Sequence, residues 1–224
     1  MNVLVIGANG QIGQILTDKL QNHEKHEVIA GVRKDEQKEA YENKGITSRF
    51  IDLEGSIEDM EKAMENVDAV VFTAGSGGNT GADKTMMIDL DGAIKSMIAA
   101  KNSQIKRYVI VSGFNANRRE KWSDYDGSET IGGYYFAAKH YADEWLKNSG
   151  LEYTIIRPTG LLNEDGRDKV KIADQLDADS DSFEIPRADV AGIIVSALDN
   201  DSTVNKSFDV TGGEDSIVDA LKKI

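Results

Sequence analysis

A chain of 224 residues with a formal net charge of −13 and no cysteine sets the first limits on what this protein can be. The length fits one α/β domain with a sizeable core. The acidic surface argues against nucleic-acid and membrane partners, and the lack of cysteine excludes disulfides, thiolate metal sites and cysteine nucleophiles. No apolar run is long enough to cross a membrane, and Met1-Asn2 leads into the first strand without a signal peptide. We therefore expect a soluble, cytoplasmic protein without a metal.

The N-terminal segment carries the most informative motif. A strand expected over Val3–Ile6 runs into a segment with three spaced glycines, and apolar residues at helical spacing follow. Such glycines form the crevice that binds a dinucleotide pyrophosphate: one permits a tight turn, the next lets the backbone approach the phosphates, and the last lets helix and strand pack. The helix adds unpaired N–H groups and its positive dipole end. A plain tight turn is the structural alternative. The expected cofactor contacts are Gly7, Asn9, Gly10, Gln11, Ile12 and Gly13.

Strands and helices alternate along the rest of the chain, as in a parallel sheet covered on both faces. The expected strands are Val3–Ile6, Glu27–Val32, Thr47–Ile51, Ala69–Thr73, Arg107–Val111, Tyr153–Arg157 and Ser207–Val210. The expected helices are 12–22, 35–43, 57–65, 84–102, 133–148, 187–198 and 214–222. This pattern predicts an α/β fold: a doubly wound parallel sheet of about seven strands in a three-layer α/β/α domain that spans residues 1–224.

Two long connections, 113–132 and 158–186, interrupt the alternation. Each follows the C-terminal end of an expected strand, which is the edge where ligands bind in open α/β sheets. The second holds only short apolar pieces such as Val170–Ala173. We expect both connections to be loops that form a small substrate-side region.

The end of the second strand selects the cofactor, because the residue there contacts the adenosine ribose. The strand ends in Arg33-Lys34, and two cations suit a 2′-phosphate while offering no acceptor to a 2′-OH. Asp35 and Glu36 follow at once, so a register different by two residues would reverse the preference. A solvated arginine at a strand end is the structural alternative. We expect NADP(H), with NAD(H) as the other possibility.

Two further strand ends are expected along the same cofactor. The Asp52 carboxylate, followed by Leu53, can accept a hydrogen bond from an adenine amino group at the end of the third strand. Ala74 and Gly75, after the fourth strand, are small enough for the backbone to pass close to adenine and ribose. Ordinary turn chemistry explains each pair equally well.

Candidate catalytic residues follow the fifth strand. Ser112 places a hydroxyl at the strand end, and Tyr135 and Lys139 are four residues apart, on one face of the next helix. Tyr is a poor acid–base group near pH 7 unless a cation stabilises its phenolate, which the Lys139 ammonium can do. Tyr135 would then donate a proton, Ser112 would donate a hydrogen bond to a substrate carbonyl, and Lys139 would also hold the nicotinamide ribose. The plainer interpretation is a packed Tyr135 and a solvated Lys139.

In this order, these motifs resemble the atypical short-chain dehydrogenase/reductases of the NAD(P)-binding, NmrA-like and epimerase/dehydratase-like kind. The glycine spacing fits that group, and further matching segments are Ile88-Asp89-Leu90-Asp91-Gly92-Ala93, Arg107-Tyr108-Val109, Tyr153-Thr154-Ile155-Ile156-Arg157-Pro158 and Pro186-Arg187-Ala188-Asp189-Val190-Ala191. The resemblance implies a Rossmann fold with strand order 3-2-1-4-5-6-7. It also implies that Ser112, Tyr135 and Lys139 occupy the family's catalytic positions and that Pro158 lies near the nicotinamide carboxamide.

The sequence thus predicts an NADP(H)-dependent oxidoreductase that reduces a small carbonyl, quinone or flavin-like acceptor. A non-catalytic NADP(H) sensor is the alternative, because some relatives bind the cofactor without turnover. A small epimerase or dehydratase is a further candidate. The expected partner is a small-molecule acceptor, and no motif indicates an oligomeric state.

Overall fold

The computed structural model describes residues 1–77, 80–124, 132–177 and 183–224. The strands are β1 (Asn2–Ile6), β2 (Glu27–Val32), β3 (Thr47–Phe50), β4 (Ala69–Phe72), β5 (Arg107–Val111), β6 (Glu152–Pro158), β7 (Gly160–Leu162), β8 (Val170–Ala173), β9 (Glu184–Pro186) and β10 (Lys206–Gly212). The helices are α1 (Gln11–Gln21), α2 (Asp35–Glu42), α3 (Ile57–Ala63), α4 (Ala82–Lys84), the π-helical η1 (Thr85–Gly92), α5 (Ala93–Asn102), the 3₁₀-helical η2 (Arg119–Asp124), α6 (Gly133–Lys147), α7 (Arg187–Leu198), the 3₁₀-helical η3 (Asp201–Thr203) and α8 (Ile217–Leu221). No helix within these residues is both long and apolar enough to span a membrane.

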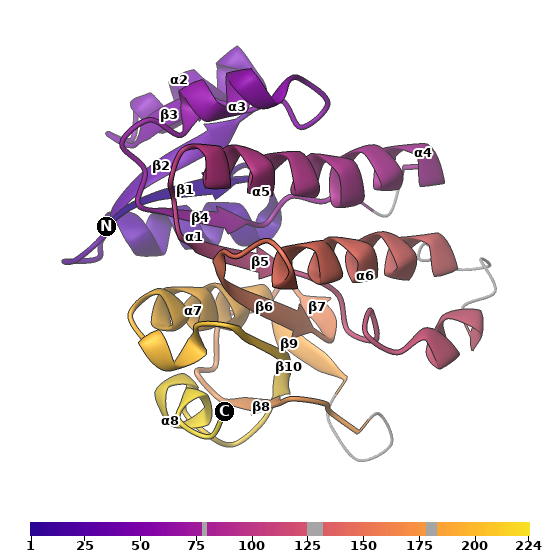
Figure 1. The fold of residues 1–224 in the computed structure, drawn as a ribbon. Coiled ribbons are helices and arrows are strands. Elements are labelled where there is room, and N and C mark those ends of the chain that lie inside the picture. Colours follow the sequence, from indigo (N-terminus) through magenta and orange to yellow (C-terminus); the bar gives the residue numbers. More distant parts are fainter. Residues whose placement is uncertain (78–79, 125–131, 178–182) are drawn as a thin grey trace.

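The main sheet has the order β3-β2-β1-β4-β5-β6-β10-β8, and Figure 1 shows helices on both of its faces. From β3 to β10 every neighbouring pair is parallel. The predicted doubly wound α/β sheet and its order of seven strands are therefore confirmed, with β10 as the seventh strand. Because the strands are parallel, the segments after β1, β4 and β5 meet at one edge of the sheet.

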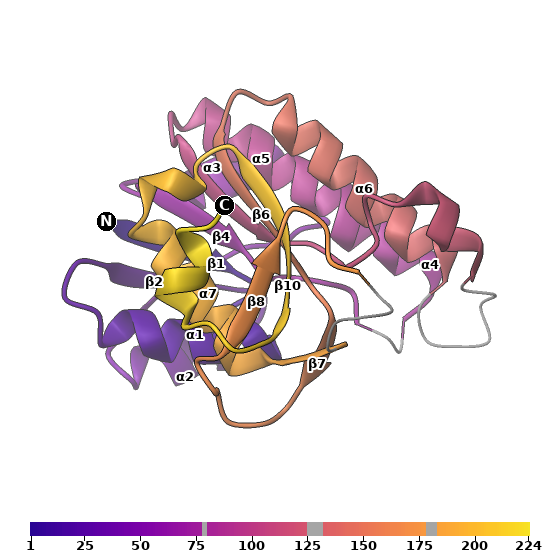
Figure 2. The same ribbon diagram turned by 90° about the horizontal axis from the view of Figure 1, so that it is seen from below.

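The connection 158–186 differs from the prediction, since it is not only a loop. Strand β8 pairs antiparallel with β10 and extends the main sheet to eight strands, while β7 and β9 form a separate parallel pair. Figure 2 shows β8 beside β10 at the edge of the sheet. Val170 and Ile172 are buried and Lys171 between them is exposed, the alternation of a half-buried strand. The strand pattern of β8 is weak in the sequence because Lys171 interrupts its few apolar residues, and residues 178–182 lie outside the described part.

Two of the predicted helices differ in the structure. The helix predicted over 84–102 consists of α4, η1 and α5, and its middle third is π-helical. The helix predicted over 214–222 is the shorter α8, which starts after Ser216 because the Ser216 side chain accepts a hydrogen bond from Asp219 N. The connection 113–132 contains η2, and its residues 125–131 are not among the described ones.

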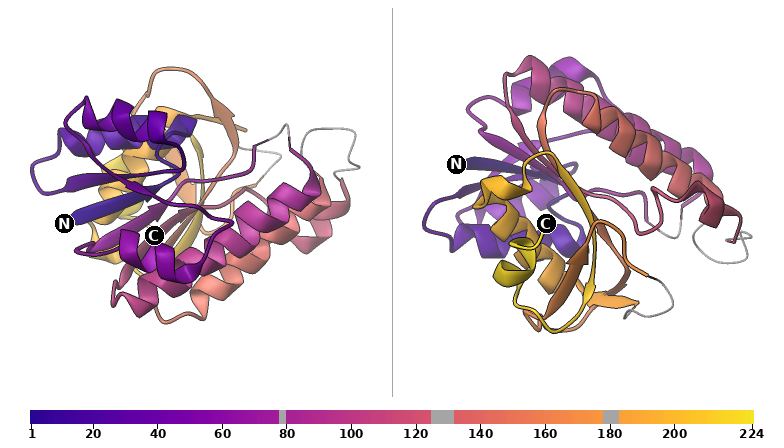
Figure 3. Two further views of the ribbon diagram at one scale, coloured as in Figure 1. Left: turned by 90° about the horizontal axis from the view of Figure 1, so that it is seen from above. Right: turned by 60° about the horizontal axis from the view of Figure 1, so that its bottom comes forward.

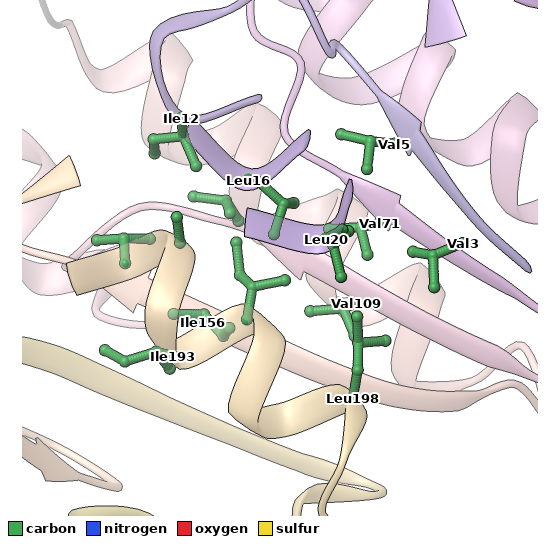
Figure 4. Packing of buried hydrophobic residues seen from close by; sticks show 14 of the residues in the cluster. Val3, Val5, Ile12, Leu16, Leu20, Val71, Val109, Ile156, Ile193 and Leu198 are labelled. Carbon is green, nitrogen blue, oxygen red and sulfur yellow. The ribbon is translucent and has the colours of Figure 1, made fainter. Parts of the chain in front are cut away.

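The core has one cluster on each face of the sheet. Along β1, Val3 and Val5 belong to one cluster, whereas Leu4 and Ile6 belong to the other, as the alternation of a strand requires. Figure 4 shows the first cluster, where α1 and α7 pack together over the sheet. On the other face, η1 and α5 lie beside α6 (Figure 3). This second helix layer brings charged residues of η1 and α6 to the end of β5.

Candidate cofactor and active site

The glycine loop between β1 and α1 is shaped by close backbone contacts. Gly7 has a φ of +86°, and a Cβ on it would lie 2.6 Å from Ala74 N. A Cβ on Gly13 would lie 2.2 Å from Gly7 O. A side chain is therefore sterically excluded at both positions. Gly10 differs: it is exposed, and a Cβ there would meet only Gly7 O, at 3.2 Å. Steric packing within the protein explains Gly7 and Gly13 but not Gly10, whose expected contact with a cofactor stays a prediction.

The start of α1 offers donors to an anion at the same place. Gly10 is the N-cap and provides no side-chain cap, and the first helical bond runs from Gln14 N to Gly10 O (2.9 Å). The N–H groups of a first helical turn have no acceptor within the helix, so they can bind phosphate oxygens. Asn9 and Gln11 are exposed, but the Ile12 side chain is buried in the core. Ile12 can therefore contact a cofactor only through its backbone. The residues present fit a dinucleotide pyrophosphate.

The ends of β2 and β3 carry the residues expected around the adenosine. Arg33 and Lys34 are exposed, and Arg33 N donates to Gln37 Oε1 (3.1 Å), so the backbone is fixed while the guanidinium stays at the surface. Asp52 Oδ1 accepts from Glu54 N (2.9 Å) within a turn, which is the ordinary turn chemistry of the alternative interpretation. Leu53 is buried, and its Cβ lies 2.8 Å from the position of a Cβ on Gly92. The roles of these residues toward a cofactor stay predictions.

Lys84 is a neighbouring cation that sequence reasoning missed. Its Nζ lies 2.7 and 2.9 Å from the two carboxylate oxygens of Glu54, and this pair raises the pKa of Lys84. The Arg33 guanidinium is near enough to act on the same ammonium in the opposite direction. Only the tertiary structure could reveal this, because α4 and the turn after β3 are separate segments.

The structure brings the three candidate catalytic residues together at the end of β5. Ser112 is buried, and its N–H donates to Ile156 O (2.8 Å). Tyr135 lies in the first turn of α6, and its Oη is 3.1 Å from the position of a Cβ on Gly113. Glycine after Ser112 therefore makes room for the phenol. Lys139 Nζ lies 5.9 Å from the centroid of the Tyr135 ring.

Two buried aspartates complete this arrangement, and sequence reasoning did not select either. Asp89, on the π-helical η1, has Oδ1 3.2 Å from Lys139 Nζ, and its Oδ2 accepts from Ser76 N (2.9 Å). Asp143, one turn after Lys139 on α6, accepts from Ser112 Oγ at Oδ2 (2.8 Å). The spacing of Tyr135, Lys139 and Asp143 on one helix face could have indicated Asp143. No local pattern indicates Asp89. We call the buried residues Asp89, Ser112, Lys139 and Asp143, together with the half-buried Tyr135, the buried polar cluster.

The charges of the buried polar cluster determine which groups are ionised. Burial is the largest influence on the pKa of Lys139 and lowers it, but the opposite effects of Asp89, Tyr135 and Asp143 together outweigh burial. The net pKa is raised, so Lys139 stays an ammonium. Burial raises the pKa of Tyr135; Lys139 lowers it, and Asp89 and Asp143 raise it further. The net pKa of Tyr135 is raised, contrary to the expectation that Lys139 would favour a phenolate. Tyr135 is therefore a neutral phenol, suited to donate a proton.

A second group of buried charges lies behind the site and fixes the substrate-side segments. Asp209 on β10 accepts from Arg157 Nε (2.6 Å) and Arg118 Nη2 (2.8 Å), and also from Leu176 N (3.1 Å). These bonds join β6 and β10 to the segments before η2 and after β8. Pro158, at the end of β6, is buried and its carbonyl accepts from Phe114 N (3.2 Å). A contact of Pro158 with the nicotinamide stays a prediction.

One cluster of metal-ligating side chains occurs in the described residues, away from this edge: His23, His26 and Asp199. His23 Nδ1 accepts from Lys25 N (3.3 Å), so the proton of the neutral ring is on Nε2, which faces Asp199 Oδ2 at 3.1 Å. Lys25 Nζ lies 3.7 Å from the other oxygen of the same carboxylate. The carboxylate already has an ammonium and a ring N–H as partners, so we interpret the cluster as a structural contact between the segment after α1 and the end of α7.

A glycine crevice at the C-terminal edge of a doubly wound sheet, with Tyr135 and Lys139 beside it, defines a nucleotide-binding Rossmann protein of the short-chain dehydrogenase/reductase type. The chain belongs to the NAD(P)H-binding family, whose model matches residues 7–201.

Three similar proteins place the chain further. It is 47% identical over 224 residues to an uncharacterized sugar epimerase, YhfK, of Bacillus subtilis, and covers 100% of both chains. A solved structure of a putative NAD-dependent epimerase/dehydratase from Bacillus halodurans has a TM-score of 0.88, with 37% identity and 100% of each chain covered. Sanguinarine reductase of Eschscholzia californica is 28% identical, over 99% of this chain and 93% of its own. The relatives thus carry both epimerase and reductase names.

Proposed function

We propose that the protein is an NADP(H)-dependent oxidoreductase that reduces a small carbonyl, quinone or flavin-like acceptor. The observation that carries this proposal is the position of Tyr135: its hydroxyl lies over Gly113, next to Ser112, with the Lys139 ammonium behind the ring. A neutral phenol at this sheet edge can protonate the acceptor oxygen or nitrogen that becomes negative when a hydride is added to the acceptor, for example the oxygen of a carbonyl whose carbon takes the hydride. A bound reduced nicotinamide supplies that hydride.

The residues of the glycine loop and the strand ends would hold the cofactor. The first-turn N–H groups of α1 bind the pyrophosphate beside Gly10, and Arg33 with Lys34 pairs with a 2′-phosphate. The Lys139 ammonium has three protons. One is directed to Asp89 and one to Val111 O (3.2 Å), which leaves the third for a ribose hydroxyl or the Tyr135 oxygen. Asp89 thus sets the direction in which the ammonium points.

The substrate-side segments favour a small acceptor over a nucleotide sugar. Between β6 and α7 the described chain forms only three short strands, β7, β8 and β9, and β8 is used to extend the main sheet. This region is too small for the substrate domain that a nucleotide sugar requires. The reductase among the relatives agrees with this proposal better than the epimerase names do.

The test is NADPH oxidation against a panel of quinones, flavins and aldehydes, with Tyr135→Phe and, as a matched control, Tyr134→Phe. Tyr134 precedes it in α6 and is 39% exposed. We expect Tyr135→Phe to lower kcat by about 10²–10⁴-fold, the usual value of general acid catalysis, with unchanged NADPH affinity. Tyr134→Phe should leave both unchanged. Equal kcat in Tyr135→Phe and wild type would refute the proton-donor role. Tight NADPH binding without turnover on any acceptor would favour the non-catalytic sensor.

A further inference from the structure

The hydroxyl of Ser112 is already engaged inside the protein. Ser112 Oγ donates its only proton to Asp143 Oδ2 at 2.8 Å, and both residues are buried. A hydroxyl has one donor and two acceptor positions. While this bond persists, Ser112 can accept a hydrogen bond from a ligand but cannot donate one to it. This is the reverse of the role that the sequence suggested.

Asp143 is a group whose ionisation can change. Its Oδ1 is buried and has no hydrogen-bond partner within the described residues. The groups that face the carboxylate are Ser112, which directly follows β5, then Tyr135, Lys139 and Lys147 from α6, and Arg157 from β6. Burial raises the pKa of Asp143 to about 6, and it outweighs the opposite effects of Arg157, Ser112, Lys139 and Lys147. Arg157 Nε lies 2.6 Å from Asp209 Oδ1, so the guanidinium charge is divided between the Asp209 and Asp143 carboxylates.

We propose that Asp143 is a positioning residue that sets the hydrogen-bond polarity of Ser112 and, through it, the class of acceptor that the site binds. This rests on the proposed oxidoreductase function. With Asp143 ionised, Ser112 offers a lone pair and favours a ligand with an N–H or O–H donor beside its reducible group. With Asp143 protonated, the 2.8 Å contact reverses: the carboxyl donates to Ser112 Oγ, and the hydroxyl proton turns to the ligand. Ser112 then suits a bare carbonyl oxygen.

This change moves one proton and no electrons. Asp143 takes the proton from solvent, and the hydroxyl of Ser112 changes only the direction of its hydrogen. Tyr135 remains the donor to the reduced acceptor in both states. The proposal therefore predicts that pH changes which acceptor binds best. Protonation of Asp143 should change KM more than kcat.

The first experiment needs no turnover. We would follow the carboxyl C=O stretch by infrared difference spectroscopy of the whole protein between about pH 4 and pH 8, in wild type, Asp143→Asn and Ser112→Ala. One carboxyl should titrate near pH 6 and be missing in Asp143→Asn. In Ser112→Ala its pKa should rise, because the lost hydrogen bond favoured the ionised form. Glu144→Gln, one residue along α6 with an exposed side chain, should keep the titration.

The second experiment compares 3-hydroxybenzaldehyde with 3-methoxybenzaldehyde as NADPH-dependent substrates. For the methyl ether, KM should fall about two- to tenfold from pH 8 to pH 5, the range of one net hydrogen bond. Ser112→Ala should abolish this change. The hydroxy compound should have the lower KM at pH 8.

No carboxyl titration near pH 6, or the same pH dependence of KM in Ser112→Ala, would overturn the proposal. Absence of turnover on every acceptor would instead count against the oxidoreductase function. The infrared titration would still decide whether Asp143 controls Ser112.

Discussion

The glycine loop and the buried polar cluster lie at the same edge of the sheet but are built on different physics. In the loop, backbone atoms leave no room for a Cβ on Gly7 or Gly13, and the ligand-facing groups are backbone N–H donors. In the cluster, Lys139 is balanced by Asp89, and Ser112 is held by Asp143, all of them buried. One region depends on the absence of side chains, and the other on polar side chains from three separate segments, of which η1 and α6 supply the charges. Substitutions in the two regions should therefore destabilise the protein for different reasons: steric overlap in the loop and an unpaired buried charge in the cluster.

The largest effect is expected for Asp89→Ala. Removing one partner of a buried ion pair leaves the Lys139 ammonium without its carboxylate, which costs about 3–5 kcal/mol of the free energy of unfolding. Urea unfolding measures this. The control is Glu144→Ala, which removes the exposed partner of Lys147 (2.8 Å) and should cost less than about 1 kcal/mol. Similar losses in the two variants would show that charge does not dominate the cluster.

The glycine loop should be sensitive to a single methyl group. Gly7→Ala combines the left-handed backbone, about 1–2 kcal/mol, with a clash against Ala74. Gly45 also has a positive φ, +75°, but a Cβ there meets nothing within 4 Å. We expect Gly7→Ala to lower the free energy of unfolding by about 2 kcal/mol more than Gly45→Ala does, because only Gly7 adds overpacking. An equal loss in both variants would mean that the loop relaxes and is not sterically fixed.

The smallest expected effect is on cofactor choice. Arg33→Ser should weaken NADPH binding about tenfold, since one charge-assisted hydrogen bond to the 2′-phosphate is lost. NADH binding should not change, which makes it the internal control in a fluorescence titration. If both affinities fall equally, Arg33 contacts a part shared by the two cofactors. If neither falls, the solvated-arginine interpretation is right.

Much of the fold could be predicted from local patterns, and the failures have a common cause. Val3–Ile6 is wholly apolar and Arg107–Val111 ends in three β-branched residues, so each gives an uninterrupted apolar run that indicates a buried strand. Strand β8 escaped prediction because Lys171 interrupts the apolar residues of Val170–Ala173 and the strand is stabilised by pairing with β10. The π-helical segment of η1 escaped because the sequence 85–92 has the ordinary composition of an α-helix.

The candidate site shows the same division. Ser112, Tyr135 and Lys139 could be selected because strand end and helix spacing are visible along the chain. The direction of the pKa shift of Tyr135 could not be predicted, because burial raises this pKa most and the neighbouring Asp89 and Asp143 raise it further. Burial and the approach of Asp89 from another helix are decided by tertiary packing.

The sequence by itself determined the parallel sheet and the place of the glycine crevice, because hydrophobic periodicity and glycine spacing act over a few residues, while the strand order came from the resemblance to a known family. Only the tertiary structure decided which groups are charged and which way their protons point. Burial and the approach of Asp89 and Asp143 from η1 and α6 set those properties. Electrostatic interactions in a low-dielectric interior depend on distance in space, and the chain order does not contain that distance.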